Sequence, residues 1–220
     1  MATAMTFNSL VQVDLPAYLE RGTPPDQTVY NQLPRLINLA EREIAQRLKI
    51  LGFIQPMISA LVAGQPVYQK PDRWRRTVSM NYGVATVVDP AQNSRVPIYA
   101  RSLEYCQRYW PDQSLTAPPK FVSDYDYQHW LIAPTPDLDY PWALNLYMLP
   151  PLLDAVNQTN WTTDYAPNAL LYRTLIECTP FLKNDERIAV WKDMYEEQIM
   201  GLQNQDLQRI VDRAATRKED

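Results

Sequence analysis

The stretch from Pro167 to Leu202 constrains the fold most strongly, because it encodes two helices that are joined by a short polar turn. Proline suits the first position of a helix, where its missing N–H costs no hydrogen bond, so a helix is predicted to start at Pro167. This helix carries an apolar stripe at helical spacing, namely Leu171, Leu175, Cys178 and Leu182. The second helix carries another, namely Ile188, Trp191, Tyr195, Ile199 and Leu202. A short connection makes the two helices antiparallel neighbours, with stripe against stripe.

The apolar stripe changes phase after Gly201. Four apolar residues lie roughly a third of a turn away from the preceding stripe, namely Leu207, Ile210, Val211 and Ala214. The two stripes cannot face the same neighbour along one straight helix. The chain therefore either bends near Gly201–Asn204 or presents its terminal segment to something else, and a partner subunit is the economical answer.

Two helices are also expected closer to the N-terminus. A short one spans about Asp14 to Glu20, with Asp14 as its N-cap. Asp26 then caps a longer helix that reaches about Lys49 and has one apolar face, formed by Leu33, Leu36, Ile37, Ala40, Ile44 and Leu48. Pro34 lies inside this run, so the helix either kinks there or has its firm part start there.

Residues 50–150 show a different pattern, with short segments that are broken by proline. Six segments are predicted to be strands, namely Gln55–Val62, Pro66–Gln69, Trp74–Tyr82, Phe121–Tyr125, His129–Ala133 and Trp142–Met148. The last is the clearest, because its apolar residues alternate and one face must be buried. A short helix is predicted from Ser102 to Trp110. We interpret the region as a small antiparallel β unit inserted between helices, which is an α+β arrangement.

Composition narrows the range of functions. The 220 residues include 21 basic and 25 acidic side chains, and the net charge of −4 argues against nucleic-acid binding over the whole surface. Fourteen tyrosines and six tryptophans are numerous, and such side chains are favoured at subunit contacts. No N-terminal apolar segment and no long apolar run occur, so neither secretion nor membrane insertion is expected. Cys106 and Cys178 are interpreted as buried free thiols.

The residues offer little for catalysis. The single histidine, His129, lacks the Gly-x-Ser-x-Gly context of a nucleophile and its base, so a structural role is favoured. The five glycines stand alone and build no phosphate-binding loop. No zinc or calcium motif occurs. We therefore predict no catalytic residue, no cofactor and no metal ion.

Two charged clusters leave alternatives open. Four carboxylates lie near proline and tyrosine, namely Asp124, Asp126, Asp137 and Asp139. They are compatible with a small hydrolase or a calcium site, although Asp beside Pro is typical of ordinary turns. Residues 70–76 (KPDRWRR) form a basic cluster with one aromatic side chain. This cluster is compatible with contact to a phosphate backbone, but a solvated strand end or a salt-bridge patch between subunits is favoured.

Four blocks of the chain, taken together, carry a family resemblance. They are LAEREI at 39–44, IAPTPD at 132–137, the strand at 142–148 followed by LPPL, and NALLY at 168–172 followed by TPFLKNDER at 179–187 and Trp191. In order and spacing they resemble the head-to-tail adaptor proteins of tailed phages, also called gateway or connector proteins, and especially those of short-tailed phages. The likeness runs from about residue 5 to residue 205.

The resemblance implies a virion protein without enzymatic activity, located at the head–tail junction and made in the host cytoplasm. Such adaptors form a ring, usually of about twelve subunits, between the capsid portal and the tail or nozzle. DNA passes through the channel of the ring without specific binding. The partners implied are therefore portal protein, tail protein and neighbouring copies of the chain, with no membrane and no cofactor.

The expected fold class combines both lines of reasoning. It is α+β and mainly α, a helical bundle with an inserted small antiparallel β unit and a long C-terminal helical segment. We expect one adaptor domain over residues 1–220. Within it lie helices at about 14–49, a β-rich insertion at about 50–150, the hairpin at 167–202 and a C-terminal docking segment at 203–220.

Partner-binding residues are predicted for each end of the adaptor. The portal contacts are Leu207, Ile210, Val211 and Ala214. Weaker candidates for the tail-facing surface are Tyr82, Tyr99, Tyr125 and Tyr127. Another head-completion or stopper protein, a small DNA-binding protein and a small hydrolase stay open as alternatives, in this order of preference.

Overall fold

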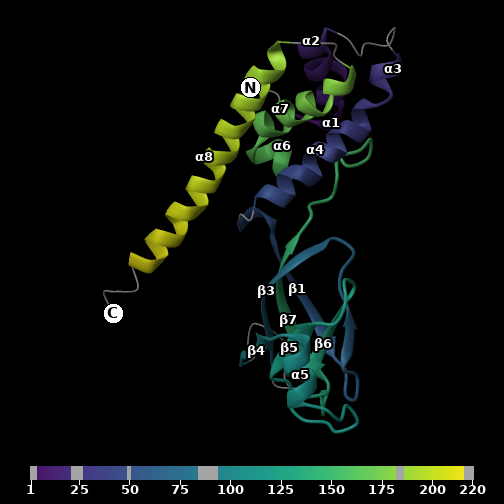
Figure 1. The fold of residues 1–220 in the computed structure, drawn as a ribbon, viewed down its shortest axis with the longest axis vertical. Coiled ribbons are helices and arrows are strands. Elements are labelled where there is room, and N and C mark those ends of the chain that lie inside the picture. Colours follow the sequence, from purple (N-terminus) through teal and green to yellow (C-terminus); the bar gives the residue numbers. More distant parts are fainter. Residues whose placement is uncertain (1–3, 21–26, 49–50, 84–93, 182–185, 216–220) are drawn as a thin grey trace. The chain divides into compact units, whose positions relative to one another are not determined.

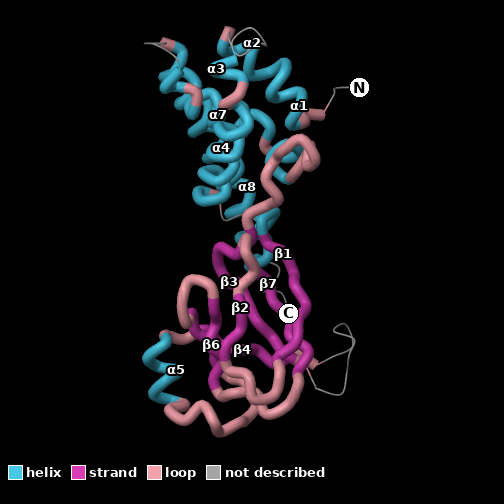
Figure 2. The backbone as a smooth tube through the Cα atoms, turned by 90° about the vertical axis from the view of Figure 1, so that its right-hand side faces the viewer, coloured by secondary structure: helices cyan, strands magenta, loops and turns pink. Residues whose placement is uncertain are grey.

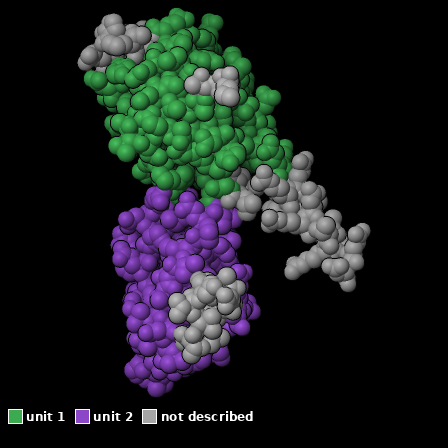
Figure 3. Space-filling view, turned by 180° about the vertical axis from the view of Figure 1, so that it is seen from behind, with its two compact units in different colours: residues 1–53, 149–220 green, residues 54–148 purple. Residues whose placement is uncertain are grey.

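The computed structural model describes residues 4–20, 27–48, 51–83, 94–181 and 186–215, with the side chains of the last range described as far as residue 205. The chain divides into two compact units, which Figure 3 colours separately. The helical unit comprises residues 1–53 and 149–220, and the β unit comprises residues 54–148.

The helical unit combines short helical turns with three longer helices (Figure 1). In chain order its segments are α1 (Phe7–Ser9), the π-helical turn η1 (Leu10–Asp14), α2 (Leu15–Leu19), α3 (Gln27–Tyr30), α4 (Leu33–Arg47), the 3₁₀ turn η2 (Leu51–Phe53), α6 (Trp161–Tyr165), α7 (Pro167–Glu177), the 3₁₀ turn η3 (Thr179–Phe181) and α8 (Arg187–Ala215).

The first helical run begins earlier than its sequence pattern predicts. Thr6 is the N-cap, and its hydroxyl and that of Ser9 form a reciprocal capping box with the two backbone N–H groups. Asp14 has helical backbone angles and makes no capping hydrogen bond. The predicted cap at Asp14 is therefore wrong, because Thr6 already satisfies the free N–H groups of a run that starts at Phe7.

The next helix also starts later than predicted. α4 begins at Leu33 and has Pro34 in its first turn, where proline breaks no hydrogen bond. A separate short helix, α3, precedes it. The sequence left open whether the helix kinks at Pro34 or has its regular part start there, and the second alternative is confirmed. Its predicted apolar face is buried and consists of Leu33, Leu36, Ile37, Ala40, Ile44 and Leu48.

The predicted helical hairpin is present as α7 and α8, which pack against each other. α7 begins at Pro167, as predicted. On α7 and just after it, Leu171, Leu175 and Cys178 are buried. Of the stripe predicted on α8, Trp191, Tyr195 and Ile199 are buried, whereas Ile188 and Leu202 are only partly buried; Leu182 of the first stripe lies outside the described residues. Cys106 and Cys178 are both free and buried, as predicted, and burial raises the pKa of the Cys178 thiol to about 12.

The β unit is one curved seven-stranded sheet with a single helix in its described residues (Figure 2). Its strands are β1 (Ile54–Leu61), β2 (Val67–Gln69), β3 (Trp74–Tyr82), β4 (Val96–Ala100), β5 (Phe121–Asp124), β6 (His129–Ala133) and β7 (Tyr140–Met148), and its helix is α5 (Leu103–Tyr109). The strand order is β1-β7-β3-β4-β5-β6-β2. All neighbouring strands are antiparallel except β4 and β5, which are parallel.

The expected fold class is wrong. The chain is about 44% helix and 25% strand, and its seven strands form a mixed half-barrel rather than a small antiparallel unit in a mainly helical bundle. Two features caused the error. The strand β4 contains Pro97 and was not predicted, and its parallel pairing with β5 adds a connection that local patterns do not reveal. The six predicted strands and the predicted short helix are present, with small shifts at their ends.

The two faces of the half-barrel differ in what covers them. The inner face holds the main core of the unit, which is rich in aromatic side chains and consists of Leu61, Tyr68, Met80, Ile98, Val122, Trp130, Ile132, Tyr140, Trp142, Leu144 and Leu146. On the outer face, α5 covers β5 and β6 through a smaller cluster around Cys106, Leu131 and Ala133. The alternation predicted for β7 is confirmed, because Trp142, Leu144 and Leu146 all face the main core.

Candidate assembly surfaces

The described residues contain no group of three or more His, Cys, Asp or Glu side chains that could hold a metal ion. In the same part of the chain, no helix combines the length and the apolar character that a membrane span needs. The polar side chains that are buried or close together instead link one element to another, and they do so differently in the two units.

In the helical unit, a network of polar side chains joins α4, α7 and α8 around the buried Tyr195. The Tyr195 hydroxyl donates a hydrogen bond to the Glu43 carboxylate. Arg47 donates two hydrogen bonds to Glu196, at N–O distances of 2.6 and 2.7 Å. The Arg173 guanidinium lies 3.3 Å from Glu43 and 5.8 Å from the centre of the Tyr195 ring. Burial and the Glu43 contact raise the pKa of Tyr195, so its hydroxyl remains a proton donor.

A second link in this unit is the fully buried carboxylate of Glu41 on α4. One of its oxygens accepts a hydrogen bond of 3.0 Å from the Leu153 N–H, and the other accepts one of 2.5 Å from the Asn160 amide. The Asn160 side chain also caps α6. Burial raises the pKa of Glu41, because removal from water disfavours the charged form more than the hydrogen bonds favour it. This carboxylate attaches the segment before α6 to α4.

In the β unit, the structure brings the basic and the acidic clusters of the sequence together at Lys70. The Lys70 side chain is almost fully buried, and its ammonium lies 2.7 Å from the Asp124 carboxylate and 2.8 Å from the Asp126 carbonyl oxygen. It also lies 4.0 Å from the centre of the Trp74 ring. The Asp126 carboxylate in turn contacts the His129 ring at 2.9 Å, which lowers the pKa of Asp126. Lys70 and His129 therefore have structural partners.

The two remaining carboxylates of the acidic cluster are held by different groups. Asp137 accepts a hydrogen bond of 2.8 Å from the Tyr140 hydroxyl, and burial together with this bond raises the pKa of Tyr140 to about 12. Asp139 accepts a hydrogen bond of 2.8 Å from the Ala63 N–H. The Asp137 contact is local, as in an ordinary turn, whereas Asp139 binds a backbone N–H that is distant in the sequence.

The four tyrosines predicted to face the tail differ in exposure. Tyr99 on β4 is 56% exposed, and Tyr125 and Tyr127 between β5 and β6 are 46% and 78% exposed. Tyr82 at the end of β3 is only partly exposed, and its ring packs against Tyr140 at a centroid distance of 4.9 Å. Three of the four tyrosines are thus available to a partner, whereas Tyr82 contributes to the packing of the β unit.

Tyr99 belongs to a larger aromatic and basic surface, which we call the α5 surface. It consists of Tyr99, Arg101, Tyr105, Tyr109, Lys120 and Phe121, which lie on or directly beside β4, α5 and β5. The Tyr105 and Tyr109 rings pack edge-on against Phe121 at 5.3 and 4.9 Å. The Arg101 guanidinium lies 5.9 Å from the Phe121 ring centre. Exposed tyrosines beside arginine are typical of protein contacts.

Most of the α5 surface was missed by sequence reasoning. One signal was available, because Tyr105 and Tyr109 are four residues apart on the predicted short helix and therefore share a face. The contact of that face with Phe121 depends on the parallel pairing of β4 and β5, in which Tyr99 lies opposite Phe121. Such pairing is not readable from local sequence.

The predicted portal contacts lie on α8, which runs without interruption from Arg187 through Gly201 to Ala215. The helix therefore continues through Gly201–Asn204, where the apolar stripe changes phase. The side chains of Leu207, Ile210, Val211 and Ala214 lie outside the described residues. Among the described side chains of α8, Val190, Met194 and Met200 are exposed.

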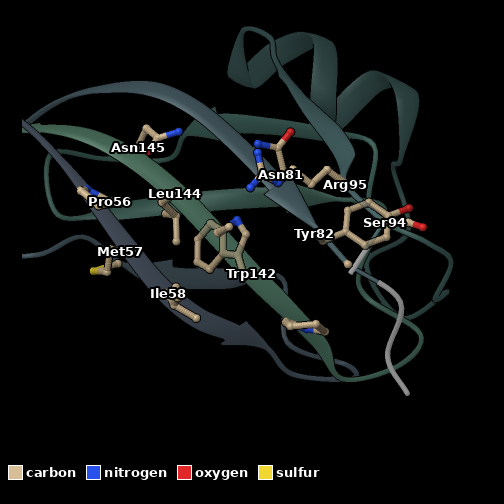
Figure 4. A pocket seen from close by; sticks show the side chains of 13 residues that line it. Pro56, Met57, Ile58, Asn81, Tyr82, Ser94, Arg95, Trp142, Leu144 and Asn145 are labelled. Carbon is tan, nitrogen blue, oxygen red and sulfur yellow. The ribbon is translucent and has the colours of Figure 1, made fainter. Parts of the chain in front are cut away.

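A shallow cavity of about 310 Å³ lies over β1, β7 and β3 (Figure 4). Its lining includes Pro56 and Ile58 on β1, Ala143 and Asn145 on β7, and Asn81 on β3. The Asn145 amide donates a hydrogen bond of 2.9 Å to the Ser79 hydroxyl. The walls are mainly apolar, and Ile58 is 65% exposed. This cavity resembles a contact surface more than a reaction site, because no described carboxylate or histidine lines it.

Comparison with known proteins identifies one family. The family model described as SU10 adaptor protein matches residues 5–218. The curated proteins include none that matches the chain.

Proposed function

The chain belongs to the SU10 adaptor protein family, and from this premise we propose that it forms a ring that joins the capsid portal to the tail of a short-tailed phage. Membership makes it a phage adaptor protein and a virion component. The single observation that carries the proposal is the family match, which extends over residues 5–218. The ring, its location at the head–tail junction and its stoichiometry of about twelve are proposed.

A closed ring requires that two different surfaces of each copy meet, the front of one against the back of the next. The β unit offers the α5 surface for such contacts, through Tyr105 and Tyr109, which are 44% and 39% exposed. We assign Tyr99, Tyr125 and Tyr127 to contacts with tail or nozzle protein. The resemblance to connector proteins of tailed phages supports this assignment, and the exposure of the three rings is consistent with it.

In this proposal, DNA passes through the lumen of the ring without binding tightly to it. The whole acidic excess belongs to the helical unit, since residues 54–148 contain eight basic and eight acidic residues. A net charge of −4 per copy, repeated around a ring, opposes tight binding to DNA. The role needs no bound cofactor and no chemistry, in keeping with a structural adaptor family.

The C-terminal half of α8 provides the portal contact in this proposal. Leu207, Ile210, Val211 and Ala214 form the apolar stripe that differs in phase from the buried face of the same helix. Their removal should spare this part of the core of the helical unit, because the buried residues among the described side chains of α8, namely Trp191, Tyr195 and Ile199, all precede Gln203. A chain that ends at Gln203 should therefore stay folded but fail to join portal rings.

Light scattering tests the proposed function. The full chain should be a monomer by itself and should bind added portal rings at one copy per portal subunit. A stable monomer that ignores portal rings at every salt concentration would refute the adaptor role. The double variant Leu207→Ser and Ile210→Ser should lose binding, whereas the control Val190→Ser and Met194→Ser on the exposed part of α8 should keep it. Equal binding by both variants would refute the portal role of the C-terminal stripe.

A further inference from the structure

One edge of the half-barrel is open. β1 is the first strand in the sheet order, and β7 is its only neighbour within the part of the chain that the structure describes. Its central residues are accessible, with Pro56, Ile58, Ser59 and Ala60 all exposed. An edge strand presents unpaired N–H and C=O groups to any chain that can pair with them.

The direction of these backbone groups follows from two prolines. Opposed residues of an antiparallel pair alternate between pairs that exchange hydrogen bonds and pairs that do not. Pro56 lies opposite Asn145 and Pro141 lies opposite Ala60, and proline has no N–H to exchange. These are therefore pairs without hydrogen bonds, and the backbone groups of Pro56, Ile58 and Ala60 point away from β7.

Two hydrogen bonds confirm this direction independently. The Pro141 carbonyl accepts a hydrogen bond of 2.9 Å from the Gly83 N–H, on the β3 side of β7 and away from β1. Two residues beyond Ala60, the Val62 N–H donates a bond of 2.8 Å to the Tyr68 hydroxyl, outside β7. Tyr68 also donates to the Val62 carbonyl at 3.1 Å. The edge is thus occupied at Val62 by the chain's own Tyr68, and no other described residue pairs with it from Pro56 to Ala60.

The open part of the edge lacks the usual protection. Monomeric proteins shield an edge strand with charged side chains, with bulges or with a covering segment. β1 has no charged residue, although 21% of the chain is charged. Its pairing with β7 runs without a register shift, so no bulge twists it away. Among the described residues, Pro56 is the one protecting feature of this edge, and it removes only the first of three outward N–H groups.

The neighbouring face fits side chains of an added strand. Pro56 and Ile58 belong both to the open edge and to the cavity of about 310 Å³ on the outer face of the sheet (Figure 4). A strand that pairs with β1 would place every second side chain over this face. The walls are mainly apolar and include Arg95, so they favour apolar over basic side chains at these positions.

We propose that the open edge of β1, from Pro56 to Ala60, pairs with an extended segment of a second copy of this chain. The inference rests on the proposed function, since a ring supplies a neighbouring copy at a fixed distance. The mode is strand addition, in which main-chain hydrogen bonds hold the partner and alternate side chains fill the outer cavity.

The size of this contact argues for a second copy held in a ring. A strand of about five residues buries less than the roughly 1,200–2,000 Å² of a stable free complex. Two free copies would therefore stay apart at ordinary concentrations. Copies that are already aligned on a common template gain the contact at high effective concentration. The open edge is then compatible with a soluble monomer and with an ordered ring.

Prolines placed on β1 test the proposal by their position. Ala60→Pro removes an outward N–H and keeps every bond to β7, as Pro56 does naturally, so the protein should fold as before. Association between copies should weaken by roughly tenfold or more, because a hydrogen bond is lost and the pyrrolidine ring obstructs the partner. Analytical ultracentrifugation of the full chain, at high concentration and on portal rings, measures this association. The matched control Ser59→Pro removes an inward N–H, so it should lower the melting temperature instead.

A second pair of variants avoids changes to the backbone. Ile58→Lys adds a charge to the open edge, whereas Val62→Lys adds the same charge where Tyr68 already occupies the edge. Only Ile58→Lys should weaken association. Normal rings from Ala60→Pro and Ile58→Lys would overturn the inference and leave the adaptor role intact. A chain that associates neither with itself nor with portal rings would overturn both the inference and the adaptor role. If the variants form normal rings that fail to join tail protein, the edge binds another protein and the second-copy assignment is overturned.

Discussion

The two units satisfy their polar groups in different ways. In the helical unit, several polar side chains bind groups on other segments, as Tyr195 binds Glu43 and Glu41 binds Leu153 and Asn160. In the β unit, the interior is held mainly by aromatic packing, with Trp130 and Trp142 at 5.6 Å between ring centres. The backbone of its β1 edge has no partner in the described residues from Pro56 to Ala60.

This difference indicates which unit of the adaptor can form new contacts. Groups that are paired inside a unit cost free energy to expose, so they stabilise the unit and contribute little to association. Unpaired backbone groups at a surface lose nothing when a partner replaces water. The β unit is therefore the part of the described structure with most capacity for assembly, and the helical unit is the part with most internal cross-links.

The largest expected effect is on the interior of the β unit. Trp130 is 1% exposed and contacts Trp74 and Trp142, and its indole N–H makes no hydrogen bond. Trp130→Ala should lower the free energy of unfolding by about 3–5 kcal/mol, because it leaves a large cavity among rings. Chemical denaturation measures this loss. The control Tyr127→Ala at a site 78% exposed should change stability by less than about 0.5 kcal/mol. Equal losses would show that aromatic packing does not distinguish the interior.

A smaller effect is expected in the network of the helical unit. Tyr195→Phe removes the hydroxyl that donates to Glu43 and keeps the ring in place, so it should cost about 1–2 kcal/mol. The double variant with Glu43→Gln separates the pair from its surroundings. A coupling free energy of at least about 0.5 kcal/mol is expected. Strictly additive losses would mean that the two side chains do not stabilise each other.

The smallest effect on the free energy of unfolding, at any single pH, is expected from substitution of Glu41. Burial raises the pKa of Glu41 above 4.5, so the folded protein retains a proton there that the unfolded chain has released. This contribution to stability is complete below pH 4.5 and declines as the pH rises through the raised pKa. Carboxyl groups whose pKa is lowered, such as Asp154 and Glu196, titrate below that range.

Denaturation at a series of pH values tests this assignment. The wild-type free energy of unfolding should decline as the pH rises above 4.5, and Glu41→Gln should flatten that decline. The matched control Glu197→Gln, at an exposed position on α8, should preserve the decline. A decline of equal size in Glu41→Gln would assign the pH dependence to another group.

Helices were predictable from the sequence because their signals are local. Pro167 predicted the start of α7, and apolar spacing predicted the buried faces of α4 and α8. The error at Asp14 had a local cause as well, since the Thr6 and Ser9 capping box lies only a few residues upstream. Most of the strands were also found, because alternation such as that from Trp142 to Met148 is visible within one segment.

The order of the strands was not predictable, because it depends on pairing between distant residues. The sequence near Val96–Ala100 does not indicate that β4 pairs with β3 on one side and with β5 on the other. The α5 surface and the open edge depend on that order. Even so, the prolines that fix the direction of the β1 backbone are visible in the sequence, and they became informative once Pro56 and Pro141 had known partners.

Residue-resolved amide hydrogen exchange, in the free chain and in rings assembled on portal, tests directly whether the β1 edge pairs with a second copy. In the free chain, the account predicts fast exchange at Ile58 and Ala60 and slow exchange at Ser59, whose N–H points to β7. In the ring, exchange at Ile58 and Ala60 should slow to the level of Ser59, while the α4, α7 and α8 amides next to the Tyr195 network change little. Unchanged fast exchange at Ile58 and Ala60 in assembled rings would contradict the account.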